Sequence, residues 1–223
     1  MQTLLNELGY WQLDRAKEKK QRMVQLESSA NQLITDFSTI SSDDLKQFMP
    51  VKFDAFLSDE NTYLIENKIQ NGELGYHVLN LVTEKSTGKK VFVNRGWISA
   101  KANRKNLPKV TNPPFDWQVS GRIYPINQDI LSAEAEIEQY DQVYRLPVID
   151  VHVFAKLEEK LGESIEPFLI RLDKNDENGF KIDWQWISMQ PEKHLAYAFQ
   201  WFALAFTLLV ISFIASIERK KYK

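Results

Sequence analysis

Apolar residues are most concentrated near the C-terminal end of this chain. From Ala196 to Ile217 there are 22 residues without a formal charge, and a basic cluster follows at 219–223. As a helix with a rise of ~1.5 Å per residue, this stretch would be ~33 Å long, enough to cross a bilayer core of ~30 Å. Because no polar face interrupts it, the stretch predicts a transmembrane helix; the alternative is an unusually apolar core helix of a soluble protein.

A second helix is predicted near the N-terminus, over residues 9–34. Its apolar positions recur three, four or seven residues apart with charged residues between them, as in an amphipathic helix. Tyr10 and Trp11 stand where an apolar start gives way to a basic run that begins at Arg15. Such a junction is typical of a helix end at a membrane surface. The pattern alone favours an ordinary amphipathic helix with a solvated charged face, and it leaves the membrane-surface interpretation open.

Between these helices the pattern changes to the two-residue alternation of β-strands. Short turns, such as Asn71-Gly72 and the stretch 86–88, separate the first strands. Strands joined by short turns pair in the antiparallel direction, because parallel pairing needs a longer crossover. The predicted strands cover 51–57, 62–69, 73–83, 89–98, 116–125, 166–172 and 180–186.

Three other segments interrupt the predicted strands. Residues 106–116 form a proline-rich loop, and residues 126–143 form a polar, acidic loop with a helical turn. Residues 149–162 predict a helix that stops at Gly162. The sequence therefore predicts an α+β fold with a mostly antiparallel sheet, open or barrel-like, an N-terminal helix and a C-terminal transmembrane helix. The predicted boundaries are 1–34 for the first helix, 35–193 for the β-rich domain, 194–217 for the membrane helix and 218–223 for the basic tail.

Charge is distributed unevenly between the domain and the tail. Four of the 28 basic residues and one of the 30 acidic residues follow Ile217, so 24 basic and 29 acidic residues remain in 1–217, a net charge of −5. A mildly acidic domain argues against nucleic-acid binding, which requires neutralisation of phosphates. The absence of cysteine excludes disulfides, thiolate metal sites and a cysteine nucleophile.

The basic tail also bears on topology. Lys and Arg collect on the cytoplasmic side of membrane segments, so the tail is expected inside and the domain outside the cytoplasm. Export of the domain needs an earlier signal, and residues 1–8 are too short and too polar to supply one. Either a membrane helix precedes this sequence, or the protein is tail-anchored with a cytoplasmic domain.

No familiar catalytic pattern is present in the sequence. It lacks the paired histidines of a zinc hydrolase, a phosphate-binding glycine loop and the serine elbow of a hydrolase. His77 and His152 are best explained as structural residues of a strand and a helix. His194 differs, because it stands two residues before the apolar stretch, with Tyr197 and Trp201 within ~60° of it around a helix. This face fits a planar apolar ligand or a partner helix, and it also fits an interfacial histidine among ordinary belt aromatics.

Three separated stretches form recognisable motifs: LGYWQLDRAKEKK at 8–20, LGYHVL at 74–79 followed by VFVNRGWI at 91–98, and PEKHLAYAFQWFALA at 191–205. Together they resemble the Surfeit locus protein 1 family of cytochrome c oxidase assembly factors. Their order and spacing extend the resemblance over essentially the whole chain. The motif residues that carry it are Trp11, Gln12, Arg15, Gly75, Tyr76, Arg95, Gly96, Trp97 and His194.

The resemblance implies a bacterial inner-membrane protein with two membrane helices, a periplasmic domain and a cytoplasmic C-terminus. The first of these helices is expected to end near Leu8. The implied function is assembly of haem–copper oxidases without catalysis, assisting delivery of haem a to oxidase subunit I in contact with other assembly factors. His194 matches the haem-ligating histidine proposed for some members, with Tyr197 and Trp201 packing beside the ring. Arg95, Gly96 and Trp97 are expected to serve mainly the fold. The alternative is a membrane-anchored enzyme or adaptor of unrecognised chemistry.

Overall fold

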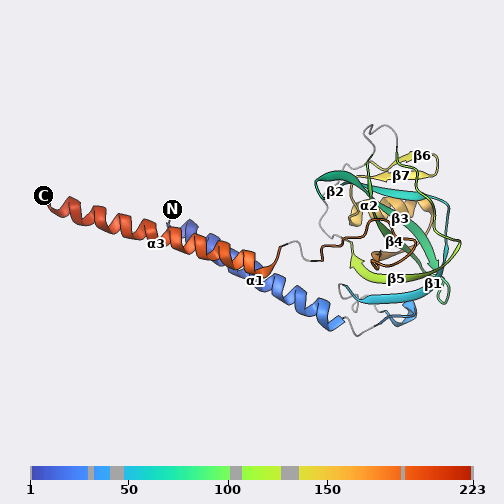
Figure 1. Cartoon of the computed structure of the whole chain (residues 1–223), viewed down its shortest axis with the longest axis horizontal. Coiled ribbons are helices and arrows are strands. Elements are labelled where there is room, and N and C mark those ends of the chain that lie inside the picture. The colour runs from blue at the N-terminus through green and yellow to red at the C-terminus, as the bar shows by residue number, and fades with distance from the viewer. Residues whose placement is uncertain are drawn as a thin grey trace. The chain divides into compact units, whose positions relative to one another are not determined.

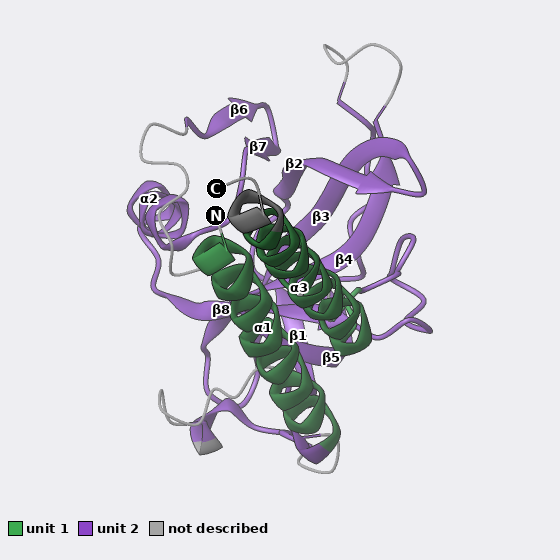
Figure 2. Cartoon of the chain, turned by 90° about the vertical axis from the view of Figure 1, so that its left-hand side faces the viewer, with its two compact units in different colours: residues 1–27, 185–223 green, residues 28–184 purple. Residues whose placement is uncertain are grey.

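The computed structural model of the chain describes residues 2–29, 33–40, 48–100, 107–126, 136–186 and 189–221. The chain divides into two compact units, coloured separately in Figure 2. Unit 1 consists of Met1–Glu27 and Gln185–Lys223, and unit 2 consists of Ser28–Trp184.

Unit 1 is built from two long helices, α1 (Gln2–Ser29) and α3 (Pro191–Lys221), which lie side by side in Figures 1 and 2. Within the described part of the chain, α3 is the one helix that is long and apolar enough to cross a membrane, over Pro191–Ile217 with a mean hydropathy of 2.1. Only 11% of its apolar window is buried. The helix therefore exposes apolar side chains along its length, as a lipid-facing helix does and a soluble core helix does not.

The N-terminal helix differs from its predicted bounds at both ends. It begins at Gln2 and ends at Ser29, whereas the spacing predicted 9–34. Ile34 lies in an extended segment: its N–H donates to the Pro50 carbonyl at 3.0 Å, and its carbonyl accepts from the Lys52 N–H at 2.8 Å. The prediction was wrong at Ile34 because an apolar residue at helical spacing can equally serve as a strand residue that enters a barrel core.

Unit 2 is a closed five-stranded barrel with extra strands. Around the barrel the order is β1 (Pro50–Leu57), β5 (Asp116–Pro125), β8 (Ile165–Leu172), β4 (Lys90–Ser99), β3 (Glu73–Glu84) and back to β1. The β4–β8 pair is parallel and the other four pairs are antiparallel. The structure thus confirms the α+β class and the mostly antiparallel sheet.

Strand β3 closes the barrel because it changes neighbours along one edge. Its first half pairs with β2 (Thr62–Gln70), and its last residues, from Val82 to Glu84, pair with β1. Strand β2 then leaves the barrel and is extended by β7 (Val143–Leu146), which runs parallel to it, and by β6 (Glu138–Tyr140). The middle of β3 and β4 is therefore covered on both faces, which explains their nearly continuous apolar sequences.

Alternate residues of β3 and β4 enter two different cores. Val82, Val91 and Val93 point into the barrel, where all five barrel strands contribute apolar side chains. Leu81 and Phe92 point outward and pack against α2 (Val151–Leu161), which covers this face of the sheet. Successive side chains of a strand point to opposite faces, so two adjacent apolar residues can enter different cores.

The helix α2 has the start and stop that its sequence predicts. The Asp150 side chain accepts hydrogen bonds from the backbone N–H groups of His152 and Val153, which satisfies two of the free donors of the first turn. Gly162 ends the helix with a φ of 66°, a left-handed conformation that glycine adopts without steric cost.

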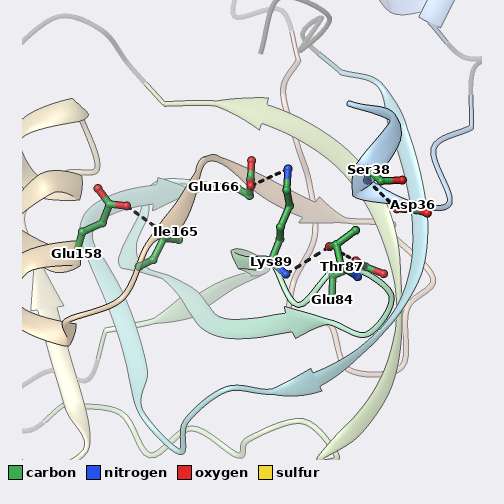
Figure 3. A network of polar contacts seen from close by, with 8 residues as sticks. All are labelled: Asp36, Ser38, Glu84, Thr87, Lys89, Glu158, Ile165 and Glu166. Carbon is green, nitrogen blue, oxygen red and sulfur yellow. Dashed lines mark hydrogen bonds and ion pairs between the residues drawn. The ribbon is translucent and has the colours of Figure 1, made fainter. Parts of the chain in front are cut away.

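Polar contacts fix the β3–β4 turn and its neighbour β8 (Figure 3). The Glu84 carboxylate accepts from the backbone N–H groups of Ser86 and Thr87, both at 2.8 Å. Lys89, at the end of this turn, pairs with Glu166 of β8 at 3.1 Å. This ion pair links β8 to the turn that leads into its parallel neighbour β4. At the start of β8, which follows α2 in the chain, the Glu158 side chain of α2 accepts a hydrogen bond from the Ile165 N–H at 2.8 Å.

Three expectations for the loops and pairing need correction. The acidic segment 126–143 contains the strand β6 within its second half, and part of this segment, 127–135, lies outside the described residues. The predicted strand 180–186 is absent except for one bridge between Lys181 and Trp97. The parallel pairs were also not anticipated, because local alternation does not specify a distant partner strand.

The Glu84 turn gives a first prediction. Burial would raise the pKa of Glu84, but hydrogen bonds from Ser86 and Thr87 outweigh burial and hold the pKa below its ordinary value of 4.5. Because the folded pKa is lowered, this stabilisation is present above the unfolded pKa and is lost as the pH falls through the folded pKa. We expect Glu84→Gln to lower the free energy of unfolding by about 1–3 kcal/mol at pH 7 and to weaken its decline in acid.

The measurement is urea unfolding of the full chain in detergent, followed by near-ultraviolet circular dichroism at several pH values. Glu177→Gln is the control, because Glu177 is an exposed carboxylate of the same unit, and a change within about 0.5 kcal/mol is expected there. Equal effects of the two substitutions would contradict the proposed turn stabilisation.

Candidate functional site

The candidate site lies in unit 1, where small residues bring α1 and α3 close together. On α1, Gly9 and Ala16 are buried and stand seven residues apart on one face. On α3, Ala198 and Ala205 are buried at the same spacing. A Cβ atom on Gly9 would approach the Phe202 ring to 2.6 Å, so glycine is needed for this contact. Small residues at such positions let two helix backbones approach closely.

A polar pair stands within this apolar contact. His194 of α3 is 8% exposed, and its Nδ1 lies 2.7 Å from Oε1 of Gln12 on α1. A carbonyl oxygen can only accept, so a hydrogen bond between these two atoms requires the Nδ1–H tautomer of the imidazole. Gln12 and His194 are called the His–Gln pair below.

The second ring nitrogen of His194 has no hydrogen-bond partner among the described residues, although it is shielded from water. Its lone pair is therefore free for a metal ion or a donor group. Nε2 of His152 and Nε1 of Trp117 are also buried and have no hydrogen-bond partner in the described part of the chain, so an unpaired atom alone does not identify a site. His194 differs from them because its other nitrogen is already held by a side chain, which fixes the direction of the free lone pair.

The aromatic residues predicted beside His194 occupy different environments. Tyr197 is 45% exposed and Trp201 is half-buried. Within unit 1 the residue buried next to His194 is Ala198, one turn further along α3. Neither aromatic side chain is fully buried, so both keep accessible apolar surface on the helix that carries His194.

The motif residues of α1, Trp11, Gln12 and Arg15, also differ in their environments. Gln12 is half-buried and bonded to His194, whereas Trp11 is 50% exposed. Arg15 lies with its guanidinium 6.0 Å from the Trp11 ring centre and forms an ion pair with Glu18 at 2.7 Å. The link between Gln12 and His194 was not identified from the sequence. One signal pointed to it: Gln12 stands between two small residues, Gly9 and Ala16, that mark a helix-packing face.

In unit 2, Arg95 is a buried cation that connects loops to β4. Its side chain is 4% exposed, and its Nε donates to the Asn178 carbonyl at 2.7 Å. Its Nη1 donates to Oδ1 of Asn80 at 3.0 Å and to the Thr111 carbonyl at 2.8 Å. Burial lowers the pKa of Arg95 to about 10, opposed by the charge of Asp176, so the guanidinium stays protonated at neutral pH. These contacts assign Arg95 to holding the proline-rich loop and the segment after β8.

Gly96 and Trp97 occupy tightly constrained positions beside Arg95. Gly96 has a φ of 111°, and a Cβ there would lie 3.0 Å from the Lys181 carbonyl. The indole of Trp97 covers Gly75, where a Cβ would lie 2.4 Å from the ring, and its Nε1 donates to the Lys68 carbonyl at 2.8 Å. Tyr76, the next residue of the same motif, is buried in a small apolar cluster.

His77 belongs to a cluster of aromatic and basic side chains in unit 2. Its ring lies edge-on to Trp184 at 5.3 Å, and the guanidinium of Arg171 lies 5.0 Å from Trp184 and 3.4 Å from Tyr124. Burial lowers the pKa of His77 to about 3, with smaller contributions from the charges of Lys68 and Arg171. His77 is therefore neutral at physiological pH, in agreement with a structural role.

Comparison with known proteins identifies the family. A model of the SURF1 family matches residues 2–206, which include α1, the whole of unit 2 and the first half of α3. The chain belongs to the SURF1 family. This family is associated with cytochrome oxidase assembly, and its members are generally assembly factors rather than enzymes.

Relatives named SURF1-like protein extend the match over nearly the full chain. The protein from Rickettsia conorii is 29% identical, and the alignment covers 99% of this chain and 88% of the relative. Those from Rickettsia felis and Rickettsia bellii are 27% and 26% identical, with 94% and 92% of this chain and 90% and 83% of the relative covered. SURF1 proteins are membrane-bound, in agreement with the apolar helix α3.

The position of Arg95 in this SURF1 family member gives a second prediction. Lysine keeps the charge but lacks the fork of donors that reaches three acceptors. We expect Arg95→Lys to lower the free energy of unfolding by at least ~2 kcal/mol, because the Asn80, Thr111 and Asn178 oxygens would lose a charged donor. Thermal unfolding of the full chain in detergent measures this loss.

Arg122→Lys is the control for the same chemical change. Arg122 is half-buried on β5 and donates through Nη1 to the Phe48 carbonyl at 3.0 Å, its one side-chain hydrogen bond to the described residues, which an ammonium group can replace. A melting temperature of Arg95→Lys equal to that of Arg122→Lys would show that the three contacts of Arg95 do not stabilise unit 2.

Proposed function

We propose that this protein is an inner-membrane assembly factor for cytochrome c oxidase that holds haem a transiently and assists its delivery to oxidase subunit I. The observation that carries the proposal is the state of His194: Nδ1 is bonded to Gln12, while the shielded Nε2 has no hydrogen-bond partner among the described residues. A buried nitrogen without a partner loses the hydrogen bond that water would give it, and coordination to iron would replace that bond.

The residues around His194 are chemically suited to a haem. A neutral imidazole nitrogen is the commonest axial ligand of haem iron. Tyr197 and Trp201, three and seven residues further along α3, offer flat apolar surface for packing against a porphyrin ring. When bound, haem a supplies the redox-active iron that the oxidase requires; the residues of this chain would only bind, orient and shield it.

The same proposal includes location and partners. The domain, unit 2, would lie in the bacterial periplasm, α3 would cross the inner membrane, and the basic residues from Arg219 onward would remain in the cytoplasm. The partners would be oxidase subunit I and other assembly factors. This orientation is supported by the basic residues that directly follow the apolar span Pro191–Ile217.

The ligand role of His194 gives a third prediction. We expect His194→Gln to abolish the shifted haem absorption band of purified protein titrated with haem a in detergent, because the amide is a poor iron ligand. His152→Gln is the matched control, since His152 also carries a buried Nε2 that no described residue bonds, but it lies on α2 of unit 2. Equal haem uptake by wild type and His194→Gln would remove His194 from the site.

The assembly role is tested in cells by the same pair of variants. A strain that lacks this protein should have less haem a in its oxidase, and wild type or His152→Gln should restore it while His194→Gln should not. Normal oxidase level and haem content in the deletion strain would favour a membrane-anchored enzyme or adaptor instead.

The orientation gives a fourth prediction. Alkaline phosphatase fused after Lys223 should be inactive and green fluorescent protein at the same place should be fluorescent, because the first requires export and the second folds in the cytoplasm. The opposite pattern would place the C-terminus outside and contradict a periplasmic unit 2 joined through a single crossing of α3.

A further inference from the structure

Gln12 is the one described side chain that contacts the imidazole of His194 through a hydrogen bond. The two residues lie on different helices, 182 positions apart in sequence. They meet within a contact made by Gly9 and Ala16 on α1 and by Ala198 on α3, all of which are buried. Because small residues hold the helices close, the amide reaches the imidazole directly and at 2.7 Å, a short distance for such a bond.

This contact decides which nitrogen of His194 carries the proton. A neutral imidazole has one N–H group and one lone pair, and the partner of one nitrogen fixes the role of the other. With Oε1 of Gln12 accepting from Nδ1–H, the lone pair is on Nε2. If Nε2 carried the proton instead, the lone pair of Nδ1 would face the lone pairs of Gln12 Oε1 at 2.7 Å, a repulsive contact in place of a hydrogen bond.

The same contact also fixes the orientation of the ring. Rotation about the Cβ–Cγ bond of His194 would break the bond to Gln12, so the direction of the Nε2 lone pair is set by α1 as well as by α3. Metal-bound histidines in proteins are usually held in this way, by a group that accepts from the nitrogen not bound to the metal.

We propose that Gln12 is the positioning residue of the haem-binding histidine: its side-chain oxygen holds His194 as the Nδ1–H tautomer and directs Nε2 toward the iron. The ligand role of His194 is the part that rests on the proposed function. The tautomer and ring orientation are properties of the unliganded protein and stand independently of it.

The first experiment therefore uses the full chain without haem. In detergent, ¹⁵N NMR of histidine-labelled protein should assign the unprotonated nitrogen of His194 to Nε2. Gln12→Glu retains an accepting oxygen and should keep this tautomer. Gln12→Met has a similar length without an amide oxygen and should lose it, giving a mixture of tautomers. An Nε2–H tautomer in wild type, with Nδ1 accepting from the Gln12 amide, would overturn the proposal.

The second experiment measures haem a binding and the reduction potential of the bound haem. Loss of the group that orients a metal-bound histidine typically weakens binding ~10–100-fold, and we expect a loss of this size for Gln12→Met. Gln12→Glu should bind haem a as wild type does. It should lower the reduction potential of the bound haem, because a carboxylate makes the imidazole a stronger electron donor than an amide does. Gln200→Met is the matched control, because Gln200 is exposed on α3. This variant should bind haem as wild type does.

The outcomes separate this inference from the proposed function. Haem binding that is lost in His194→Gln but unchanged in Gln12→Met, with the same potential in Gln12→Glu, would leave His194 as the ligand and remove Gln12 from its positioning. Haem binding that is unaffected by His194→Gln would remove His194 as the ligand, while the NMR experiment would still decide whether Gln12 fixes the tautomer.

Discussion

A polar atom shielded from water has to find a partner within the protein, and this constraint sets the connections in both units. In unit 2 the buried guanidinium of Arg95 satisfies two loop carbonyls and Asn80, so one strand residue holds segments that have no regular structure of their own. The buried carboxylate of Glu84 does the same for the turn that follows β3. In unit 1 the described residues meet this constraint at one nitrogen of His194, through Gln12, and leave the other nitrogen without a partner.

The sequence predicted the elements of unit 2 better than their arrangement. The strand 116–125 and the helix that ends at Gly162 were predicted closely, because alternation, Asp150 and Gly162 are local signals. Barrel closure was left open. Closure depends on two pairings. The end of β3, Val82–Glu84, pairs with β1 where β2 no longer does, and β4 pairs with β8 in the parallel direction. Both are choices between distant segments, and an alternating pattern suits several partners equally.

The candidate site shows the same limit. The position of His194 at the head of an apolar stretch was enough to single it out, and a helical wheel placed Tyr197 and Trp201 near it. A wheel gives angles around one helix but does not identify the arc that meets a second helix. In the structure that arc contains Ala198 and Ala205, and the partner that completes the pair is Gln12, whose sequence position gives no indication of its distance from His194 in space.

On the proposed function, the incomplete satisfaction of His194 has a direct consequence for how strongly a haem is held. An assembly factor has to release its ligand to the oxidase, so it should bind the iron less tightly than the final site does. One oriented imidazole, bordered by an exposed Tyr197 and a half-buried Trp201, meets that requirement better than an enclosed pocket with two axial ligands would. The bond from Gln12 then serves both states: it keeps Nε2 ready for coordination, and it leaves the histidine correctly oriented after the haem has gone.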